Sequence, residues 1–272
     1  MLYNTGNYIN VEYLGEGSQA TVLSAVNCRT NKHVAIKIYD SKNMNCLREV
    51  RMLKKLQKLK IQHSVQYVET FIEKDKLFIV TEFVKGEELH DYLISGKIIS
   101  ITDLKVLFKK ILVAVHELHE NDICHLDLKL ENIMIEPKSG EIKLIDFGFA
   151  ESTVDETTLK EKMINKYRGS VHYSAPEIIR NVPFDGKKAD IWSLGVLFYV
   201  LVAEKFPFPG INNPNNPDAS VSVATQILHN DISFDGKFTF QMVQLIESMM
   251  NRDPTKRGSI KSLLQHSIFA GI

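Results

Sequence analysis

Short runs of β-branched and aromatic residues dominate the first third of the chain, where apolar positions alternate as they do in a strand. One stretch there differs, because residues 45–59 carry an apolar residue at every third position, which predicts a helix. The strand-forming runs are residues 11–14, 21–26, 34–37, 65–73 and 76–80. The apolar helix positions are Leu47, Val50, Leu53, Leu56 and Leu59. We therefore expect a small five-stranded antiparallel sheet with one main helix.

The remaining two-thirds of the chain show mainly helical spacing. Residues 101–121 carry one broad apolar face, and residues 191–203 are apolar on nearly every side, which predicts a fully buried helix. This second stretch is too short to cross a bilayer, so we expect no membrane span. Further helical patterns cover residues 221–229, 238–250 and 259–265. The sequence thus predicts the α+β class, with a large and mostly helical second part.

Composition narrows the function classes. The chain has 33 basic and 33 acidic residues, so no overall positive field favours nucleic acid or an anionic membrane, and we expect neither as a partner. Three cysteines without a C-x-x-C pair argue against a disulfide framework or a zinc site and fit a reducing compartment. The polar first ten residues lack the apolar core of a signal peptide. We expect an intracellular protein, in the cytoplasm, the nucleus or both.

The stretch from His125 to Gly148 gathers the polar residues with the clearest chemical potential. It predicts a loop, a strand over 133–135, a Pro-Lys-Ser-Gly turn and a second strand over 143–147. Such a hairpin can bring Asn132 and Asp146 together, where their oxygens could hold a hard cation. Asp127 would lie nearby as a proton acceptor. Singly, each residue is more simply a turn or cap residue, so the combination carries the signal.

Two features of the first third could serve a phosphate ligand. Gly15 and Gly17 lie between two predicted strands, where their backbone N–H groups could approach phosphates, although such glycines are usually only a turn. In the strand V-A-I-K, Ala35 and Lys37 share a face, which suits a flat base beside a phosphate, although a strand lysine usually faces solvent. Glu49 is the candidate partner of Lys37, with a solvated helix charge as its alternative.

The order D-x-K-x-x-N followed by D-F-G resembles the catalytic loop and metal-binding triplet of the eukaryotic protein kinase family. The resemblance covers residues 8–269 and implies a two-lobed protein kinase fold. Its small lobe would span about 8–82, its hinge 82–87 and its large lobe 88–269, with no additional domain. It also implies transfer of the γ-phosphoryl of ATP, with Mg²⁺, to a protein hydroxyl. Within the family, the pattern is closest to the calmodulin-dependent and energy-sensing Ser/Thr kinases.

The resemblance assigns roles residue by residue. Asp127 would be the catalytic base, Lys129 would point at the transferring phosphate as in Ser/Thr-specific members, and Asn132 and Asp146 would bind Mg²⁺. The implied ATP-binding positions are Leu14, Gly15, Glu16, Gly17, Ser18, Gln19, Ala20, Thr21, Val22, Ala35, Lys37, Glu49, Glu82 and Val84. Implied structural or regulatory positions are His125, Phe147, Gly148, Ser170, Glu177, Asp190 and Arg257.

Some of these roles come with specific expected contacts. Glu177 is expected to form a buried pair with Arg257. Asp190 lies in an apolar run and is expected to accept backbone N–H groups of the catalytic loop. The backbone of Glu82 and Val84 would bind adenine, with Thr81 controlling the depth of that pocket.

One departure from the family concerns regulation. The family usually has Arg between the His and Asp of the catalytic loop, where it pairs with a phosphorylated activation loop, whereas this chain has Leu126. The same H-L-D order is seen in the myosin-light-chain and death-associated branch. We therefore expect activity that does not depend on phosphorylation of Ser152, Thr153, Thr157 or Thr158.

The sequence predicts substrates and partners in less detail than it predicts the catalytic residues. Glu88 and Glu131 match positions where basophilic kinases hold a substrate Arg, although solvated surface carboxylates are an equal alternative. We expect protein substrates with Ser or Thr acceptors, and an activating or targeting subunit stays open. A pseudokinase that binds nucleotide or partners is the main alternative, favoured by Ala20 and Leu126. A third interpretation is a small-molecule kinase, which the A-P-E segment and the predicted helix that contains Asp190 argue against.

Overall fold

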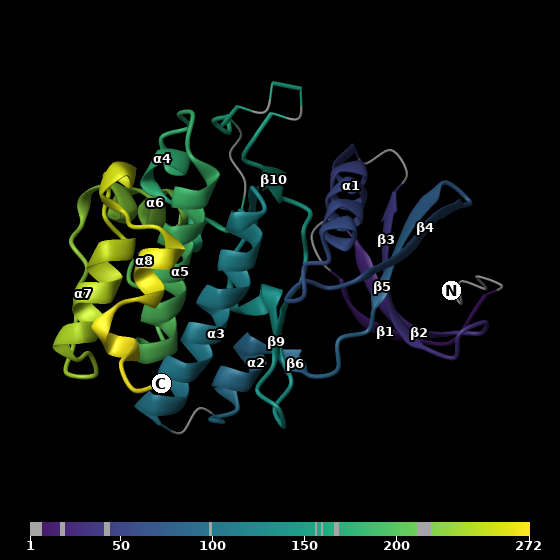
Figure 1. The fold of residues 1–272 in the computed structure, drawn as a ribbon, viewed down its shortest axis with the longest axis horizontal. Helices are drawn as coiled ribbons and strands as arrows, with labels where there is room; N and C mark the ends of the chain where they lie inside the picture. The colour runs from purple at the N-terminus through teal and green to yellow at the C-terminus, as the bar shows by residue number, and fades with distance from the viewer. Residues whose placement is uncertain are drawn as a thin grey trace. The chain divides into compact units, whose positions relative to one another are not determined.

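The computed structural model describes residues 7–16, 20–40, 44–97, 100–155, 157–158, 160–165, 169–210 and 219–272 (Figure 1). The chain divides into two compact units. The first unit contains Met1–Gly86 together with Lys143–Gly148, and the second contains Glu87–Ile142 together with Phe149–Ile272. Each unit is described by itself.

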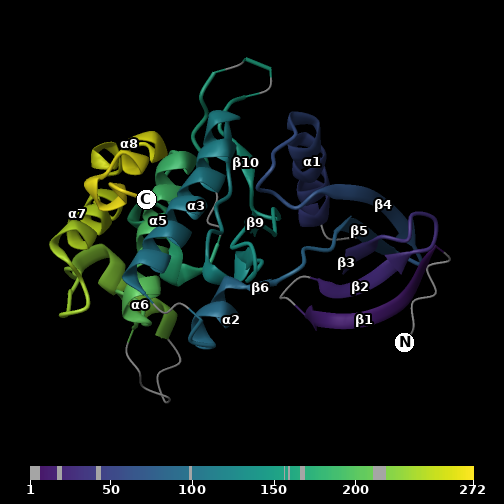
Figure 2. The same cartoon turned by 60° about the horizontal axis from the view of Figure 1, so that its bottom comes forward.

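A five-stranded antiparallel sheet forms the first unit, which confirms the sheet predicted from the alternating pattern. Its strand order is β1-β2-β3-β5-β4 (Figure 2). The strands are β1 (Tyr8–Glu16), β2 (Thr21–Asn27), β3 (His33–Asp40), β4 (Tyr67–Glu73) and β5 (Lys76–Glu82). The side chains of Val34, Ile36 and Ile38 are buried in one apolar cluster with Phe78. The period of two therefore directs Ala35, Lys37 and Tyr39 to the opposite face of β3.

Helix α1 (Met44–Leu59) is the main helix of the first unit. Val50, Leu53 and Leu56 are buried, whereas Leu47 and Leu59 are exposed. The buried face instead includes Cys46, Val50, Leu53 and Leu56, because apolar residues at every third position drift around a helix with 3.6 residues per turn. Glu49 lies on this face and is buried as well, which is costly for a carboxylate unless donors surround it.

The second unit is mainly helical. Its helices are α2 (Leu89–Ile94), α3 (Ile101–Glu120), α4 (Pro176–Ile179), α5 (Gly186–Ala203), α6 (Ala219–His229), α7 (Phe240–Met249) and α8 (Ile260–Leu264). Short strands are β6 (Glu87–Glu88), β7 (Ile123–Cys124), β8 (Ile133–Ile135) and β10 (Glu151–Ser152). Four 3₁₀ turns cover Leu130–Asn132, Val171–Tyr173, Pro254–Lys256 and Ser267–Phe269. Helix α5 is buried along nearly its whole length, as its continuous apolar sequence predicts.

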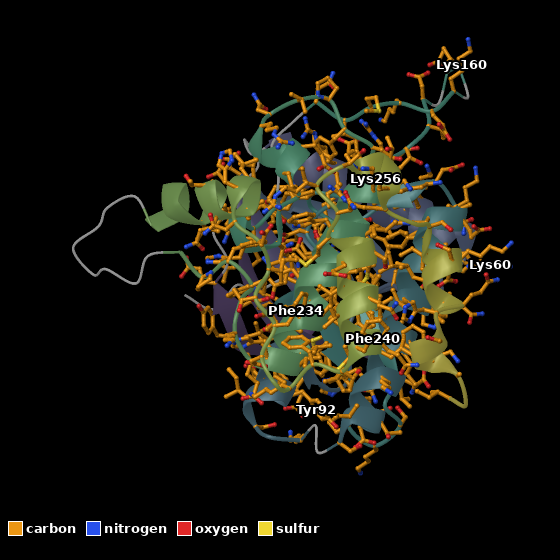
Figure 3. All side chains as sticks on the ribbon, turned by 90° about the vertical axis from the view of Figure 1, so that its left-hand side faces the viewer. Lys60, Tyr92, Lys160, Phe234, Phe240 and Lys256 are labelled. Atoms are coloured by element: carbon orange, nitrogen blue, oxygen red, sulfur yellow. The ribbon has the colours of Figure 1, made fainter. Side chains whose placement is uncertain are left out.

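The core around α5 is built from aromatic side chains. Phe108 of α3 stacks on Phe198 of α5 with 4.3 Å between ring centroids. Tyr199 of α5 lies 4.9 Å from Phe238, which in turn contacts Phe234 edge-on at 5.2 Å, in the segment before α7. Phe234 and Phe240, the first residue of α7, are labelled in Figure 3. In the described part of the chain, no helix has both the length and the apolar character that crossing a membrane requires.

Two strands end at other residues than predicted. The strand predicted over 143–147 is β9 (Ile142–Leu144), which stops because Asp146 has a left-handed backbone with φ of 59° that no strand accommodates. The strand predicted over 76–80 runs two residues further, to Glu82 in β5. Gly86 has φ of 144°, a conformation open mainly to glycine, so the chain turns there.

Candidate active site

Lys37, Glu49 and Asp146 form an ionic cluster in the first unit. Strand β3 directs Lys37 to the same face as Ala35, and its Nζ lies 3.0 Å from Glu49 Oε1 on α1. The same Nζ lies 2.8 Å from Asp146 Oδ1. The expected Lys37–Glu49 ion pair is thus present, and its alternative, a solvated helix glutamate, is wrong because the Glu49 side chain is 4% exposed.

Burial and charge act in opposite directions on this cluster. Burial disfavours the charged form of Lys37, but the Glu49 and Asp146 carboxylates outweigh it, so the pKa of Lys37 is raised. Burial also raises the pKa of Glu49, and the Lys37 ammonium opposes that rise. Lys37 therefore stays cationic at any physiological pH, while Glu49 is the member whose ionisation depends on its neighbours.

A third group on β3 completes the surroundings of Glu49. The Tyr39 hydroxyl donates a hydrogen bond of 2.5 Å to Glu49 Oε2. The Lys37 ammonium also lies 5.5 Å from the centroid of the Tyr39 ring. Sequence reasoning missed Tyr39, although its position two residues after Lys37 places it on the same strand face.

The Asp146-Phe147-Gly148 segment has a fixed backbone form. The left-handed φ of Asp146 costs about 1–2 kcal/mol for a residue other than glycine. The N–H of Gly148 donates to Asp146 Oδ1 at 3.2 Å, and Phe147 is completely buried. A Cβ added to Gly148 would lie 3.2 Å from Asp146 Oδ1, so glycine leaves this carboxylate room.

The glycines of the predicted turn lie at the end of β1 and between β1 and β2. Gly15 pairs with Val22 and Glu16 with Thr21, so the two strands stay paired up to the last residue of β1 and the first residue of β2. Leu14 is exposed and Ala20 is buried at the two ends of the predicted turn. Three of the expected nucleotide contacts, Gly17, Ser18 and Gln19, lie outside the described residues.

The end of β5 is held in place by hydrogen bonds between Glu82 and Gln66 and by an ion pair between Glu82 and Lys143. Glu82 donates its backbone N–H to the Gln66 carbonyl at 2.9 Å. Its carboxylate accepts the Gln66 N–H at 3.1 Å and pairs with Lys143 of β9. Thr81 lies opposite Ala35 in the β3–β5 register, and Val84 follows just beyond the strand. The carboxylate and the backbone N–H of Glu82 are thus both engaged within the first unit, and its contact with adenine stays a prediction.

The carboxylate of Asp127 in the second unit is surrounded by hydrogen-bond donors. Its Oδ1 accepts the Ser170 N–H at 3.0 Å and the Ser170 hydroxyl at 3.2 Å. Its Oδ2 lies 3.0 Å from Lys129 Nζ and 3.0 Å from Asn132 Nδ2. Lys129 also reaches the Ser170 hydroxyl at 3.3 Å. Four predicted site residues therefore meet in one hydrogen-bonded cluster.

Asn132 is held in one orientation within this cluster. Its amide nitrogen donates to the Asp127 backbone oxygen at 2.8 Å as well as to the Asp127 carboxylate. With the nitrogen engaged, the amide oxygen is the atom that Asn132 can offer a cation. Asp146, the other predicted metal ligand, belongs to the first unit and is described there.

Asp190 fixes the backbone that leads into Asp127. Its Oδ2 accepts the His125 N–H at 2.9 Å and its Oδ1 accepts the Leu126 N–H at 2.8 Å, as predicted. His119 Nε2 adds a third contact at 2.9 Å that the sequence did not indicate. Leu126 is buried with a left-handed φ of 63°, a conformation that a leucine keeps only when its surroundings enforce it.

Gly169 allows the segment that carries Ser170 to approach Leu126. It has φ of 90°, and a Cβ added there would lie 2.6 Å from the Leu126 carbonyl oxygen. Only glycine permits this approach, so Gly169 sets the position from which Ser170 contacts Asp127.

The expected Glu177–Arg257 pair is present and bidentate. Arg257 donates to Glu177 Oε1 at 2.6 Å and to Glu177 Oε2 at 2.8 Å. Arg257 is 1% exposed and also donates to the Asn251 carbonyl, and its guanidinium lies 5.1 Å from the centroid of the Trp192 ring. The buried Arg257 guanidinium thus has hydrogen-bond acceptors and an aromatic ring around it, which offsets the cost of burying its charge.

Glu88 and Glu131 form an acidic site in the second unit. Burial raises the pKa of Glu88, and the nearby carboxylates of Asp91 and Glu131 raise it further. Glu131 Oε2 is buried and has no hydrogen-bond partner within the described residues. Neither observation fits the alternative of two fully solvated surface carboxylates.

Comparison with known proteins identifies relatives of the whole described chain. Residues 8–269 match the protein kinase domain. The Mus musculus serine/threonine-protein kinase SIK1 is 36% identical over 93% of this chain and 31% of its own length. The Mus musculus sperm motility kinase 3A is 30% identical over 95% of this chain and 49% of its own length. The chain therefore spans less than half the length of these relatives.

Proposed function

Because the chain belongs to the protein kinase family, we propose that it transfers the γ-phosphoryl group of ATP to Ser or Thr hydroxyls of proteins. The hydrogen-bonded cluster of Asp127, Lys129, Asn132 and Ser170 carries the proposal, because it fixes a carboxylate beside a cation and a hydroxyl. Relatives named as serine/threonine kinases support the choice of acceptor, as does Lys129 in the catalytic loop.

In this mechanism Asp127 accepts the proton of the attacking hydroxyl. Its oxygens already accept hydrogen bonds from Ser170 and Asn132, so the acceptor orbitals have a fixed direction. Lys129 lies 3.0 Å from Asp127 Oδ2 and supplies positive charge where the transferred group gains negative charge. Lys37, fixed by Glu49, would hold the α- and β-phosphates.

The residues present fit magnesium. Asn132 and Asp146 offer an amide and a carboxylate oxygen, the donors that Mg²⁺ prefers. No cluster of three or more His, Cys, Asp or Glu side chains in the described ranges could bind a metal alone. Mg²⁺ takes few protein ligands and completes its shell with water and phosphate. When bound, it would neutralise charge on the phosphates.

The acidic site of Glu88 and Glu131 supports a preference for substrates with a basic residue near the acceptor. An unpaired carboxylate oxygen and a half-buried second carboxylate favour a guanidinium, which can donate to both. The pathway, whether in signalling, checkpoint or cell-cycle control, and the location in cytoplasm or nucleus stay predictions from the sequence.

The test is a radiolabelled ATP assay on an arrayed peptide library, run with unphosphorylated protein beside Asp127→Asn. The variant keeps the shape of the side chain but cannot accept the proton, so phosphoryl transfer should fall by about 10²–10⁴-fold. ATP binding, measured by calorimetry, should persist. Glu131→Gln should reduce selection of Arg-containing peptides without reducing transfer to the others.

A pseudokinase is the alternative that this assay separates from the enzyme. It would bind nucleotide but give no transfer in either protein. The chain retains all five of the expected residues, which are Lys37, Glu49, Asp127, Asn132 and Asp146. This argues against a pseudokinase, because a chain that has lost kinase activity has usually lost at least one of them. Equal transfer by wild type and Asp127→Asn would instead contradict the proposed role of Asp127.

A further inference from the structure

Tyr39 contacts both members of the Lys37–Glu49 ion pair. Its hydroxyl lies 2.5 Å from Glu49 Oε2, and its ring centroid lies 5.5 Å from Lys37 Nζ. The tyrosine is itself buried, so water does not compete for its hydroxyl. Both contacts follow from one strand, because residues 37 and 39 of β3 lie on the same face.

The buried Glu49 carboxylate needs a donor at each oxygen. Lys37 occupies Oε1 at 3.0 Å, and the Tyr39 hydroxyl occupies Oε2. A carboxylate removed from water is held in place only when its lone pairs are matched. Lys37 is meanwhile shared with Asp146 at 2.8 Å, so Lys37 alone does not determine where Glu49 lies.

We propose that Tyr39 is a positioning residue for phosphoryl transfer, which holds the Glu49 carboxylate so that Oε1 faces Lys37. This inference rests on the proposed role of Lys37 in binding phosphates. Tyr39 touches neither nucleotide nor acceptor in this role, and it acts through Glu49. An aliphatic residue at position 39 would fill space but leave Oε2 without its donor.

The ionisation of the cluster gives a readout beyond stability. Burial raises the pKa of Tyr39, so its hydroxyl stays protonated and remains a donor. Burial raises the pKa of Glu49, and Lys37 and Tyr39 oppose the rise. The other ionisable groups that act on Glu49 are Asp146 and, on α1 itself, Cys46. Loss of the Tyr39 hydroxyl should therefore raise the pKa of Glu49 further.

The experiment compares Tyr39→Phe with Tyr8→Phe. In both cases the chain loses one hydroxyl of a buried tyrosine that donates to a glutamate of the first unit, because the Tyr8 hydroxyl donates to Glu69. Tyr39→Phe should lower kcat/KM for ATP by about 10-fold, the size expected for a hydrogen bond to a charged group. It should also move the acid limb of the pH–rate profile to higher pH. Tyr8→Phe should leave both unchanged.

A double-mutant cycle tests whether Tyr39 acts through Glu49. In a Glu49→Gln background, which abolishes the titration of residue 49, Tyr39→Phe should cause a much smaller further loss and no shift of the acid limb. The inference is overturned if Tyr39→Phe keeps the wild-type profile, if the two tyrosine variants behave alike, or if the losses simply add. Lys37→Met that retains full activity would instead reject the proposed role of Lys37.

Discussion

Four donors surround the two carboxylate oxygens of Asp127, and each comes from a residue with a role of its own. Ser170 supplies two of them, Lys129 the third and Asn132 the fourth. The carboxylate therefore cannot rotate without breaking several hydrogen bonds at once. Such fixation lowers the cost of organising the reacting groups, which is the main catalytic contribution in phosphoryl transfer.

Gly169 offers a test of that fixation. Gly169→Ala would place a Cβ 2.6 Å from the Leu126 carbonyl at a φ of 90°. Ser170 would be pushed away from Asp127, and we expect kcat to fall on the order of 100-fold, as small misplacements near a reacting group do. Gly96→Ala is the matched control, because Gly96 also has a positive φ but no atom within 4 Å of an added Cβ. Equal kcat in the two variants would contradict the argument.

The Glu177–Arg257 pair predicts a large stability effect. Arg257→Met should lower the free energy of unfolding by about 3–5 kcal/mol, because Glu177 would remain buried without its partner. Lys205→Met removes an exposed partner from Asp235 and should cost about 1 kcal/mol or less. Urea denaturation of both variants measures the difference, and similar midpoints would show that the buried pair is not structural.

At the scale of elements, backbone hydrogen bonds anchor both ends of the segment that follows β10. Thr153 N–H donates to Asp122 at 2.9 Å, and Ile164 and Phe184 exchange backbone hydrogen bonds of 2.8 and 3.0 Å. Leu126, which stands where the family usually has arginine, is buried and has no charge with which to bind a phosphate. Activity that does not depend on phosphorylation stays a prediction from this residue.

We expect Thr157→Ala with Thr158→Ala to leave kcat/KM within about two-fold of wild type, since both threonines are exposed. Ser152 and Thr153 are better left unchanged, because they are buried and their replacement would also alter packing. The measurement is peptide phosphorylation by protein shown by mass spectrometry to carry no phosphate. A collapse of activity in the double variant would overturn the prediction.

Periodicity predicted the elements better than their contacts. The five strands, α1 and α5 follow from spacing alone, because burial of one face is a local property of a sequence. The end of β9 at Leu144 does not, since a left-handed Asp146 is enforced by its surroundings. The backbone donors to Asp190, 64 and 65 residues away, were expected only from the family resemblance, and the contact of His119, 71 residues away on α3, was not expected at all. Long-range hydrogen bonds of this kind leave no local pattern.

At the scale of the whole molecule, binding of the proposed nucleotide should raise the free energy of unfolding. A ligand that binds the folded chain and not the unfolded chain stabilises the fold by mass action. At 100 times its Kd, ATP with Mg²⁺ should add about 2.7 kcal/mol to the free energy of unfolding.

Asp146→Asn should remove most of the Mg²⁺-dependent part of the stabilisation by ATP, because it deletes a carboxylate ligand. Thermal unfolding with ATP, in the presence of Mg²⁺ or of a chelator, measures that part directly. Asp40→Asn is the control, since it changes an exposed acid that pairs with Lys76 away from the cluster. Equal stabilisation with metal and with chelator in wild type would contradict a role for the cation.

The three donors that converge on Asp190 also have a kinetic consequence. The amides of His125 and Leu126 lie in an irregular segment, where deuterium from solvent usually replaces amide hydrogen within seconds to minutes. Here both N–H groups point at a carboxylate inside α5, so they can open only when that helix separates from the loop. The amide hydrogens of His125 and Leu126 should exchange with deuterium as slowly as those of the central residues of α5. Two amides of an irregular loop would then exchange at the rate of the core.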